Sequence, residues 1–294
     1  MSHAPAPMTL ARLQAALAAA GAAPRKRHGQ HFLWRDEHLA PIVARAGVGP
    51  DDTVLEVGPG PGLLTRHLLA TGARVIAVEI DPAMRRVADQ LLEGGDLEWI
   101  ETDVLDGTRR LSAPTAERIG ECTHLVANLP YNVSAPLIAL VLAADPGPST
   151  LVVTVQREVG DRLLSGPGTA DYGPLSVQVA LRARGEMVRP LAPGCFWPAP
   201  RVQSAVVALE RVETGAMTIP EGFDAFLAGC FHNRRKTLAN SLSTATGLDV
   251  ATVIARLGLD KNQEKVRAEA LSPVQLCALA TRWADHALGG RLRP

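Results

Sequence analysis

Short apolar runs alternate with amphipathic segments through the first two-thirds of the chain. Residues 36–46, which end before Gly47, and residues 63–70 have helical spacing, whereas several other runs have the length and composition of buried strands. These runs lie at 53–57, 74–78, 97–100, 125–127 and 150–155. The order of strands and helices predicts an α/β fold with a Rossmann-like sheet, and apolar segments at 186–191 and 202–209 predict a closing β pair.

The pattern changes after residue 212, where helical periods replace the strand-like runs. They cover residues 221–231, 236–242, 249–257 and 272–288. We therefore predict a catalytic α/β domain over residues 25–212 and a small all-helical domain over 213–294. At the amino end, Thr9, the apolar run 10–20 and Gly21 predict a short helix or a loose tail over residues 1–24.

Composition narrows the classes of partner. The 294 residues carry no formal net charge, so a nucleic acid has to be met by a local basic patch. Cys122, Cys195, Cys230 and Cys277 are scattered without the spacing of a zinc site, which favours buried thiols in a reducing cytosol and no bound metal. No apolar run has the length of a membrane span, so we expect a soluble, cytoplasmic protein.

A glycine-rich loop follows the first strand of the predicted sheet. Gly58, Gly60 and Gly62 let the backbone approach a ligand, and Glu79 closes the next strand where it can accept bonds from ribose hydroxyls. Glu56 beside the loop would repel a pyrophosphate but can help to orient an amino group. We therefore predict S-adenosyl-L-methionine, rather than NAD, as the cofactor.

Two later strands also end in polar groups. Asp103 follows the run 97–100, either as a helix cap or as an acceptor for the adenine amine of the cofactor. The run 125–127 leads into Asn128, Leu129, Pro130 and Tyr131, which offer an amide, a carbonyl before a rigid proline and an aromatic face. This set suits a flat base with an exocyclic amine, although four such residues also occur in ordinary turns.

Further segments carry candidate contacts. Prolines within residues 196–204 are expected to prevent ladder pairing and to stiffen a loop that holds Phe196 over a base; the alternative is core packing, which is weaker for Phe196 than for Trp197. Residues 165–173 are glycine-rich and predict a mobile loop. Gln30 and His31, beside Phe32 and Leu33, can form a lid over a ligand. The cations expected to contact RNA, against the alternative of a solvated face, are Lys26, Arg27, Arg201, Arg234, Arg235 and Lys236.

Taken together, these segments resemble the KsgA/RsmA family of small-subunit (16S) ribosomal RNA adenine dimethyltransferases over about residues 26–279. The segments are KRHGQHFL (26–33), EVGPGPGLLT (56–65), VEID (78–81), NLPYNVS (128–134), QREVGDRL (156–163), YGPLSV (172–177), FWPAPRVQSA (196–205) and RRKTLANSL (234–242). Eight segments in this order are far more specific than any one of them.

The resemblance implies a class I methyltransferase fold and roles for particular residues. His31, Leu33, Gly58, Glu79, Asp103 and Asn128 are then expected to line the S-adenosylmethionine site. Asn128 and the Leu129 carbonyl would hold the target amine, and Tyr131 and Phe196 would sandwich its base. The family methylates N6 twice on each of two adjacent adenosines near the 3′ end of small-subunit rRNA, so the expected partner is that rRNA or the immature subunit.

Other functions remain to be separated from this one. The large-subunit adenine methyltransferase of macrolide resistance performs the same chemistry, but NLPYN and the helical domain with RRKTL favour the small-subunit enzyme. A DNA N6-adenine methyltransferase usually has two prolines in its target-base motif, and here Leu129 stands in the place of the first. A ribosome-assembly or transcription factor without a need for catalysis is the alternative of another class. We expect a monomer because no heptad pattern or large apolar stripe is evident.

Overall fold

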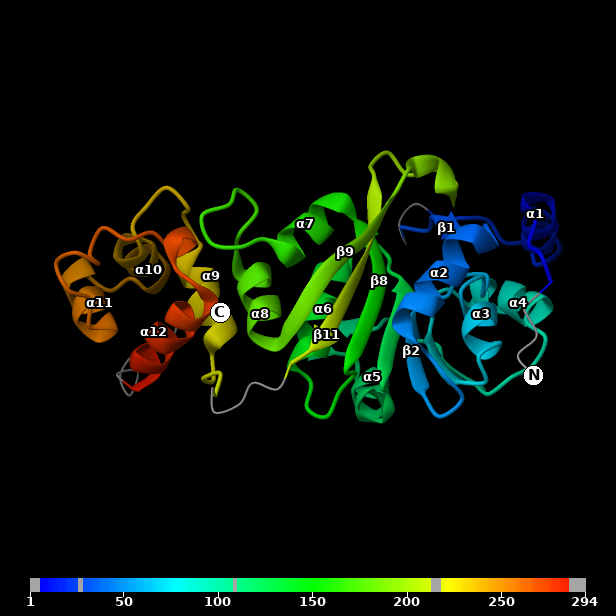
Figure 1. Ribbon diagram of the computed structural model, residues 1–294, viewed down its shortest axis with the longest axis horizontal. Helices are drawn as coiled ribbons and strands as arrows, with labels where there is room; N and C mark the ends of the chain where they lie inside the picture. The colour runs from blue at the N-terminus through cyan, green and yellow to red at the C-terminus, as the bar shows by residue number, and fades with distance from the viewer. Residues whose placement is uncertain (1–5, 26–28, 108–109, 213–217, 286–294) are drawn as a thin grey trace. The chain divides into compact units, whose positions relative to one another are not determined.

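The computed structural model describes residues 6–25, 29–107, 110–212 and 218–285. Its contacts divide the chain into two compact units, one of residues 1–160 with 183–211, and one of residues 161–182 with 212–294 (Figure 1). The predicted boundary at residue 213 thus misses the segment 161–182, which groups with the C-terminal helices. The chain leaves the first unit, returns to it and leaves it again.

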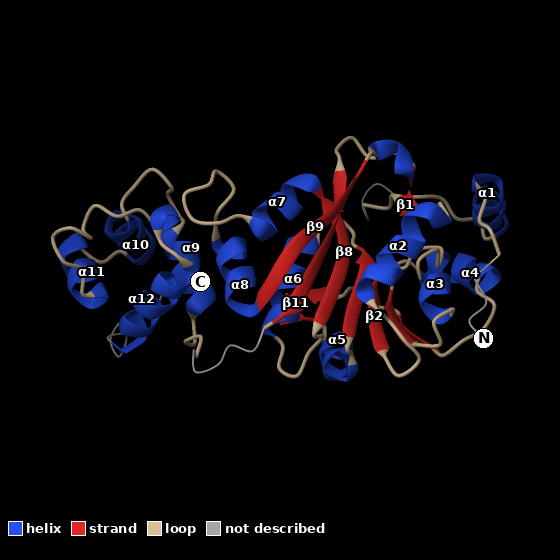
Figure 2. Ribbon diagram, in the orientation of Figure 1, coloured by secondary structure: helices blue, strands red, loops and turns tan. Residues whose placement is uncertain are grey.

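A seven-stranded sheet forms the centre of the first unit (Figure 2). Its strands, in spatial order, are β4 (Leu97–Ile100), β3 (Arg74–Val78), β2 (Thr53–Val57), β7 (His124–Asn128), β8 (Thr150–Gln156), β11 (Ser204–Arg211) and β9 (Ala183–Leu191). The five strands from β4 to β8 are parallel, and β11 runs antiparallel to both β8 and β9. The predicted α/β fold and its closing β pair are confirmed. Because parallel strands point the same way, the carboxyl ends of β3, β2 and β7 lie together.

Helices and minor elements complete this unit. The helices are α1 (Leu10–Ala19), α2 (Asp36–Ala46), α3 (Thr65–Leu69), α4 (Pro82–Leu91), α5 (Ala113–Arg118) and α6 (Ser134–Ala143), and the minor strands are β5 (Leu105–Asp106) and β6 (Arg110–Leu111). Short 3₁₀ turns lie at Ile119–Glu121 and Pro193–Cys195. Side chains of α1 to α4 share one hydrophobic cluster with alternate residues of the sheet. Helix α3 is shorter than predicted because the glycine loop continues in turns up to Leu64.

Helix α1 is part of the folded core rather than a loose tail. The Thr9 side chain accepts a hydrogen bond from the Arg12 amide and caps the helix, as the sequence predicts. Leu13 and Leu17 on one face of α1 are buried in the same cluster as the sheet. The amino-terminal segment therefore contributes apolar burial to the catalytic unit.

A two-residue strand pair corrects the prediction that prolines exclude ladder pairing in residues 196–204. Strand β1 (Phe32–Leu33) pairs antiparallel with β10 (Phe196–Trp197), and Leu33 lies opposite Phe196. The pairing ends before Pro198, which has no amide hydrogen to donate. The prolines thus limit the ladder to two residues instead of preventing it.

The second unit is helical. It contains the end of α7 (Arg157–Leu164), then α8 (Pro174–Arg182), α9 (Phe223–Cys230), α10 (Leu238–Thr246), α11 (Val250–Leu257), a 3₁₀ turn (Ala268–Ala270) and α12 (Pro273–Asp285). Tyr172, predicted in a mobile loop, is fully buried in the core of this unit, and its hydroxyl donates to the Leu271 carbonyl at 2.8 Å. The Gly168 amide donates to the Glu269 carbonyl at 2.8 Å, so the loop is attached at both places.

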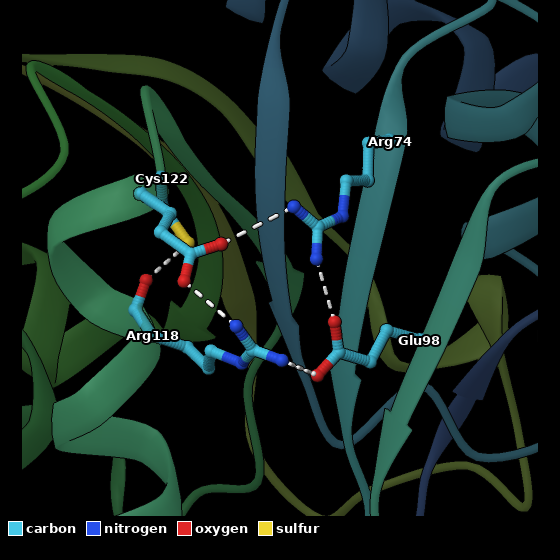
Figure 3. Close-up of polar contacts among 5 residues, drawn as sticks. Arg74, Glu98, Arg118 and Cys122 are labelled. Carbon is cyan, nitrogen blue, oxygen red and sulfur yellow. Dashed lines mark hydrogen bonds and ion pairs between the residues drawn. The ribbon is translucent and has the colours of Figure 1, made fainter.

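Four charged side chains form a closed ring at the amino end of β3 (Figure 3). Glu98 accepts from Arg74 and Arg118, both at 2.7 Å, and Glu121 accepts from Arg118 at 2.8 Å and from Arg74 at 3.2 Å. All four side chains are partly exposed, so solvent screens the ring and its effect on stability is small. Burial raises the pKa of the neighbouring Cys122 thiol to about 12, consistent with an inert buried cysteine.

Within the described ranges no helix combines the length and apolar character needed to cross a bilayer. Among the same residues, Cys122, Cys230 and Cys277 are buried, as expected, and Cys195 is half-buried; all four are free thiols.

Candidate functional site

A cavity of about 250 Å³ opens at the carboxyl ends of β2, β3 and β7. It lies where a doubly wound sheet places its ligand, at the switch in strand order between β2 and β7. The predicted residues that line it are Gln30, His31, Gly58, Gly60, Glu79, Asp103, Asn128, Leu129, Pro130 and Tyr131. Residues from five sequence segments are thus brought together at one site.

Four predicted site residues lie outside this lining. Leu33 and Phe196, partners in the β1–β10 pair, are 2% and 4% exposed and belong to the core cluster. Glu56 is 1% exposed on β2, and Gly62 packs so closely on α4 that a Cβ would lie 3.2 Å from the Ala88 methyl. Phe196 is thus buried outside the cavity lining, and its role as the second wall of a base-binding slot stays a prediction.

The lining also contains residues that the motifs did not single out. Ile80 is 45% exposed although it is a large apolar residue, and it lies between Glu79 and Asp81 at the cavity. Thr102 and Val104 flank Asp103 there. An exposed isoleucine after a strand-closing acid offers an apolar surface to a flat ring. Its position directly after Glu79 is the sequence signal that could have identified it.

The glycine loop is fixed against the strand that carries Asn128. Gly58 has φ of 68°, and a Cβ built there would lie 2.8 Å from Pro130 Cγ. Gly60 donates its amide to Glu79 Oε2 at 2.9 Å, while Glu79 Oε1 accepts from the Asp81 amide at 2.8 Å. Burial raises the pKa of Glu79, and these amide bonds oppose that rise. Each oxygen still has a free acceptor position for a ligand hydroxyl.

Glu56 is a buried acid behind this loop. Burial, and secondarily the nearby charge of Glu79, raises its pKa to about 8, while the nearby Thr65 side chain opposes the rise. Its Oε2 atom is buried and has no hydrogen-bond partner among the described residues. A positively charged group nearby would favour the ionised form, so Glu56 suits a cationic ligand better than an anionic one.

Asn128 presents an acceptor without a partner. Its Nδ2 donates to the His31 carbonyl at 3.0 Å, which assigns the other end of the amide as the oxygen. That oxygen, Oδ1, is buried and has no hydrogen-bond partner among the residues that the structure describes. The next amide, of Leu129, donates to the Thr154 carbonyl at 3.1 Å and continues the β7–β8 pairing past Asn128. The backbone carbonyls of His31 and Thr154 thus fix the positions of Asn128 and Leu129.

Two rings stack at the entrance of the site. The His31 and Tyr131 ring centroids are 5.6 Å apart with an interplanar angle of 25°. His31 Nδ1 lies 2.7 Å from the Pro198 carbonyl and donates to it, and the Tyr131 hydroxyl is 2.7 Å from Ser204 Oγ. The segment 29–31 therefore forms one wall of the cavity, as predicted for a lid.

Asp103 differs from the buried acids of the site because it is exposed. Its Oδ1 accepts a hydrogen bond from the Leu105 amide at 3.0 Å, which corresponds to a turn-capping role. Asp103 lines the cavity, and its second carboxylate oxygen can accept a hydrogen bond from a ligand amine. Both predicted roles are therefore compatible with its position.

The predicted RNA-contacting cations have different surroundings in the structure. Lys26 and Arg27 lie outside the described residues, and Arg201 is exposed. Arg234 pairs with Glu269 at 3.1 Å and donates to the Thr169 carbonyl, so it supports the helical unit. Arg235 is exposed, and Lys236 is exposed with its Nζ donating to Thr244 Oγ1 at 3.2 Å.

Comparison with known proteins gives one consistent picture. The family described as "Ribosomal RNA adenine dimethylase" matches residues 21–282. A ribosomal RNA small subunit methyltransferase A from Thermosynechococcus vestitus is 39% identical over 87% of this chain and 95% of its own length.

Solved structures agree with the sequence match. A dimethyladenosine transferase from Plasmodium falciparum is 26% identical, with a TM-score of 0.68 over 87% of this chain and 98% of that chain. The 23S rRNA methyltransferase ErmE is 24% identical, with a TM-score of 0.55 over 86% of this chain and 99% of that chain, and shows the shared fold alone. The match to the family covers the glycine loop, the Asn128 segment and most of the helical unit, and the chain belongs to the ribosomal RNA adenine dimethylase family.

Proposed function

We propose that this chain transfers methyl groups from S-adenosyl-L-methionine to N6 of two adjacent adenosines near the 3′ end of small-subunit rRNA, giving dimethyladenosine at each. Family membership supports the reaction class, and the relatives named small subunit methyltransferase A favour the small subunit over the large one. The observation that carries the proposal within the structure is the buried, unpartnered Asn128 Oδ1 beside the Leu129 backbone at the cavity.

The residues around the cavity fit this cofactor. Gly58 admits no side chain because Pro130 is too close, which leaves a bare backbone surface for a ligand. Glu79 is held by two amides with acceptor capacity left for ribose hydroxyls, and Glu56 is a buried acid without a cationic partner. S-adenosylmethionine supplies an electrophilic methyl group and a positive charge when it is bound. Glu79, Asp103 and the exposed Ile80 would hold its nucleoside part, and Glu56 would favour its amino group.

Asn128 acts in this mechanism as an acceptor and not as a base. The lone pair of adenine N6 is conjugated with the ring, so the amine is a poor nucleophile. If Asn128 Oδ1 and the Leu129 carbonyl each accept one N6 hydrogen, the nitrogen lone pair turns out of the ring plane toward the methyl donor. The two acceptors are pre-positioned because strand pairing and the His31 carbonyl fix them.

The second methyl transfer places a further demand on the same acceptors. A singly methylated N6 retains only one hydrogen, so one of the two acceptors loses its partner. Tyr131 can keep the base in place at this stage because stacking on an aromatic ring is worth about 1–3 kcal/mol per base. The proton released after each transfer can pass to water.

The wider setting of the reaction is also part of the proposal. Small-subunit rRNA, free or within the immature small ribosomal subunit, is the proposed substrate, with a role of the modification in subunit biogenesis. The exposed cations Arg235, Lys236 and Arg201 would contact its phosphates. The protein would act as a cytoplasmic monomer.

Methylation of defined substrates tests the proposal. Immature small subunits, large subunits and naked rRNA are incubated with labelled cofactor, and nuclease digests are analysed by mass spectrometry for N6,N6-dimethyladenosine. We expect the dimethylated nucleoside in small-subunit rRNA only. Label in large-subunit rRNA, or no label in any RNA, would contradict the substrate or the activity respectively.

Substitution of Asn128 tests the mechanism. Asn128→Ala should bind the cofactor as the parent does but lose at least about a hundredfold in single-turnover methylation, because aligned acceptors are lost. Asn262→Ala, at an exposed asparagine of the helical unit, is the matched control and should keep the parental rate. A near-parental rate for Asn128→Ala would refute the role of this amide.

A further inference from the structure

Ser204 connects the sheet extension to the site. It is the first residue of β11, fully buried, and lies in register with Gln156 of β8 on one side and Leu191 of β9 on the other. The neighbouring Gln203 carbonyl accepts from the Arg157 amide at 2.9 Å. Backbone pairing on both sides thus fixes the position of the Ser204 side chain.

The partner of this side chain is the Tyr131 hydroxyl. The two oxygens are 2.7 Å apart, a normal distance for a hydrogen bond between hydroxyl groups. Tyr131 lines the cavity, and its ring stacks on that of His31. The ring is therefore attached at one end through its own backbone, after Pro130, and at the other through Ser204.

We infer that Ser204 is a positioning residue for the methyl transfer, because it sets the angle of the Tyr131 ring on which the target adenine stacks. The inference rests on the proposed function and deepens it. A ring fixed only at its Cβ can turn about two torsions, whereas a hydrogen bond at the far end removes that freedom. The inference explains why a tyrosine, and not a phenylalanine, stands after Pro130.

The protonation state of the tyrosine favours this contact. Burial raises the pKa of the Tyr131 hydroxyl, and the bond to Ser204 opposes the rise. The phenol therefore remains neutral at ordinary pH, and either hydroxyl can donate the hydrogen. An ionised phenolate in this half-buried place would instead need a cation.

A double-mutant cycle tests the inference with Ser204→Ala, Tyr131→Phe and the combined variant. Loss of one hydrogen bond corresponds to about a threefold to tenfold change, so each single variant should lower the single-turnover methylation rate by that factor on saturating small-subunit substrate. The combined variant should be no slower than either single one. Cofactor affinity should be unchanged in all three.

Ser112→Ala is the matched control. It breaks another buried hydroxyl pair, between Ser112 and Thr115 at 2.9 Å, at the start of α5. It should lower the melting temperature without changing the methylation rate. If Ser204→Ala fails to fold, Tyr131→Phe carries the test alone, because it keeps the ring and removes only the hydroxyl.

Two results overturn the inference. Parental rates for Tyr131→Phe would show that the ring needs no attachment, and losses that add in the combined variant would show that the two hydroxyls act separately. Both results leave the proposed function intact if the parent protein makes dimethyladenosine and Asn128→Ala does not. Absence of that product from the parent protein would instead overturn the function itself.

Discussion

The proposed ligand contact of Glu56 comes at the expense of stability. An acid whose pKa rises to about 8 on folding holds its proton more tightly in the folded chain than in the unfolded chain. Between its ordinary pKa, 4.5, and about 8, the folded state therefore binds more protons, and the free energy of unfolding falls as pH rises through that window. Above about pH 8 the penalty of the buried charge is complete.

Glu56→Gln removes this titration without changing the size of the side chain. In cofactor-free protein at pH 8 we expect a gain of about 1–3 kcal/mol in the free energy of unfolding, similar to the usual cost of an unpaired buried polar group. The gain should shrink toward pH 5. Urea unfolding across this range measures it, and a gain independent of pH would assign the effect to packing instead. Cofactor affinity should fall in the same variant.

Individual site residues differed in how far the sequence could identify them. Asn128 and Tyr131 are polar or aromatic groups directly after a buried strand, and such groups must lie at the sheet edge whatever surrounds them. Phe196 could not be placed in this way, because its burial depends on the two-residue pairing with Leu33 from a distant segment. Ser204 carries no local signal, since its role appears only when Tyr131 lies 2.7 Å away.

At the scale of elements, the loop between β2 and α3 depends on a close contact with the residues after β7. Gly58 needs both a positive φ and the absence of a side chain, because Pro130 lies against it. Gly47, which ends α2, has nearly the same φ of 69° but nothing within 4 Å of a built Cβ. Comparing substitutions at Gly47 and Gly58 therefore separates the cost of a left-handed backbone from the cost of a steric clash.

Gly47→Ala should cost about 1–2 kcal/mol of stability from the left-handed backbone alone. Gly58→Ala should cost about 1–3 kcal/mol more because Pro130 has to move, and it should also weaken cofactor binding and methylation. Urea unfolding and calorimetric titration with S-adenosylhomocysteine measure the two effects. Equal losses in both variants, with full methylation by Gly58→Ala, would show that the contact with Pro130 is unimportant.

Elements were predictable where burial alone decides them. The parallel strands have apolar runs that fit a sheet buried on both faces, so their bounds in the structure agree with the pattern to within a residue or two. Helix α8 was not predicted, since a short apolar run that follows Gly173 and Pro174 does not distinguish helix from strand. The pairing of β1 with β10 was not predicted, because a strand of two residues is too short to show a hydrophobic periodicity.

At the scale of the whole molecule, the zero net charge makes any RNA contact depend on local patches. In the cluster 234–236 all three side chains are exposed, and Arg234 also pairs with Glu269. Contact of all three with RNA phosphates stays a prediction, and variants of Arg235 and Lys236 test it without disturbing the Arg234–Glu269 pair. Replacing Arg234 should affect the helical unit as much as the RNA.

Arg235→Gln with Lys236→Gln should weaken binding of small-subunit rRNA and reduce the salt slope of the logarithm of affinity by roughly one per residue. Filter binding at several salt concentrations measures this slope. Arg86→Gln, an exposed arginine on α4, provides the control and should leave it unchanged. A salt slope equal to the parental one in the double variant would show that both cations lie on a solvated surface and do not contact RNA phosphates.

The overall division of the chain was only partly predictable. The change from strand-like to helical periods near residue 213 marks the larger part of the helical unit, but residues 161–182 precede two strands of the sheet. Their membership follows from tertiary packing, because Tyr172, Val177 and Leu181 are buried among the C-terminal helices. The local sequence pattern shows that a segment has an apolar face but not which part of the chain that face packs against.

The chain passes between the two units three times, and this has a consequence for how the gene can be divided. A stop codon after residue 212 would leave α8 attached to the sheet, with the apolar face that α9 and α12 normally cover exposed to water. A single recombination event near that position would likewise join α8 to helices that it was not selected to fit. Exchange of the helical unit between homologous genes therefore requires three coordinated crossovers, one at each boundary between the units, which favours inheritance of the two units as one block.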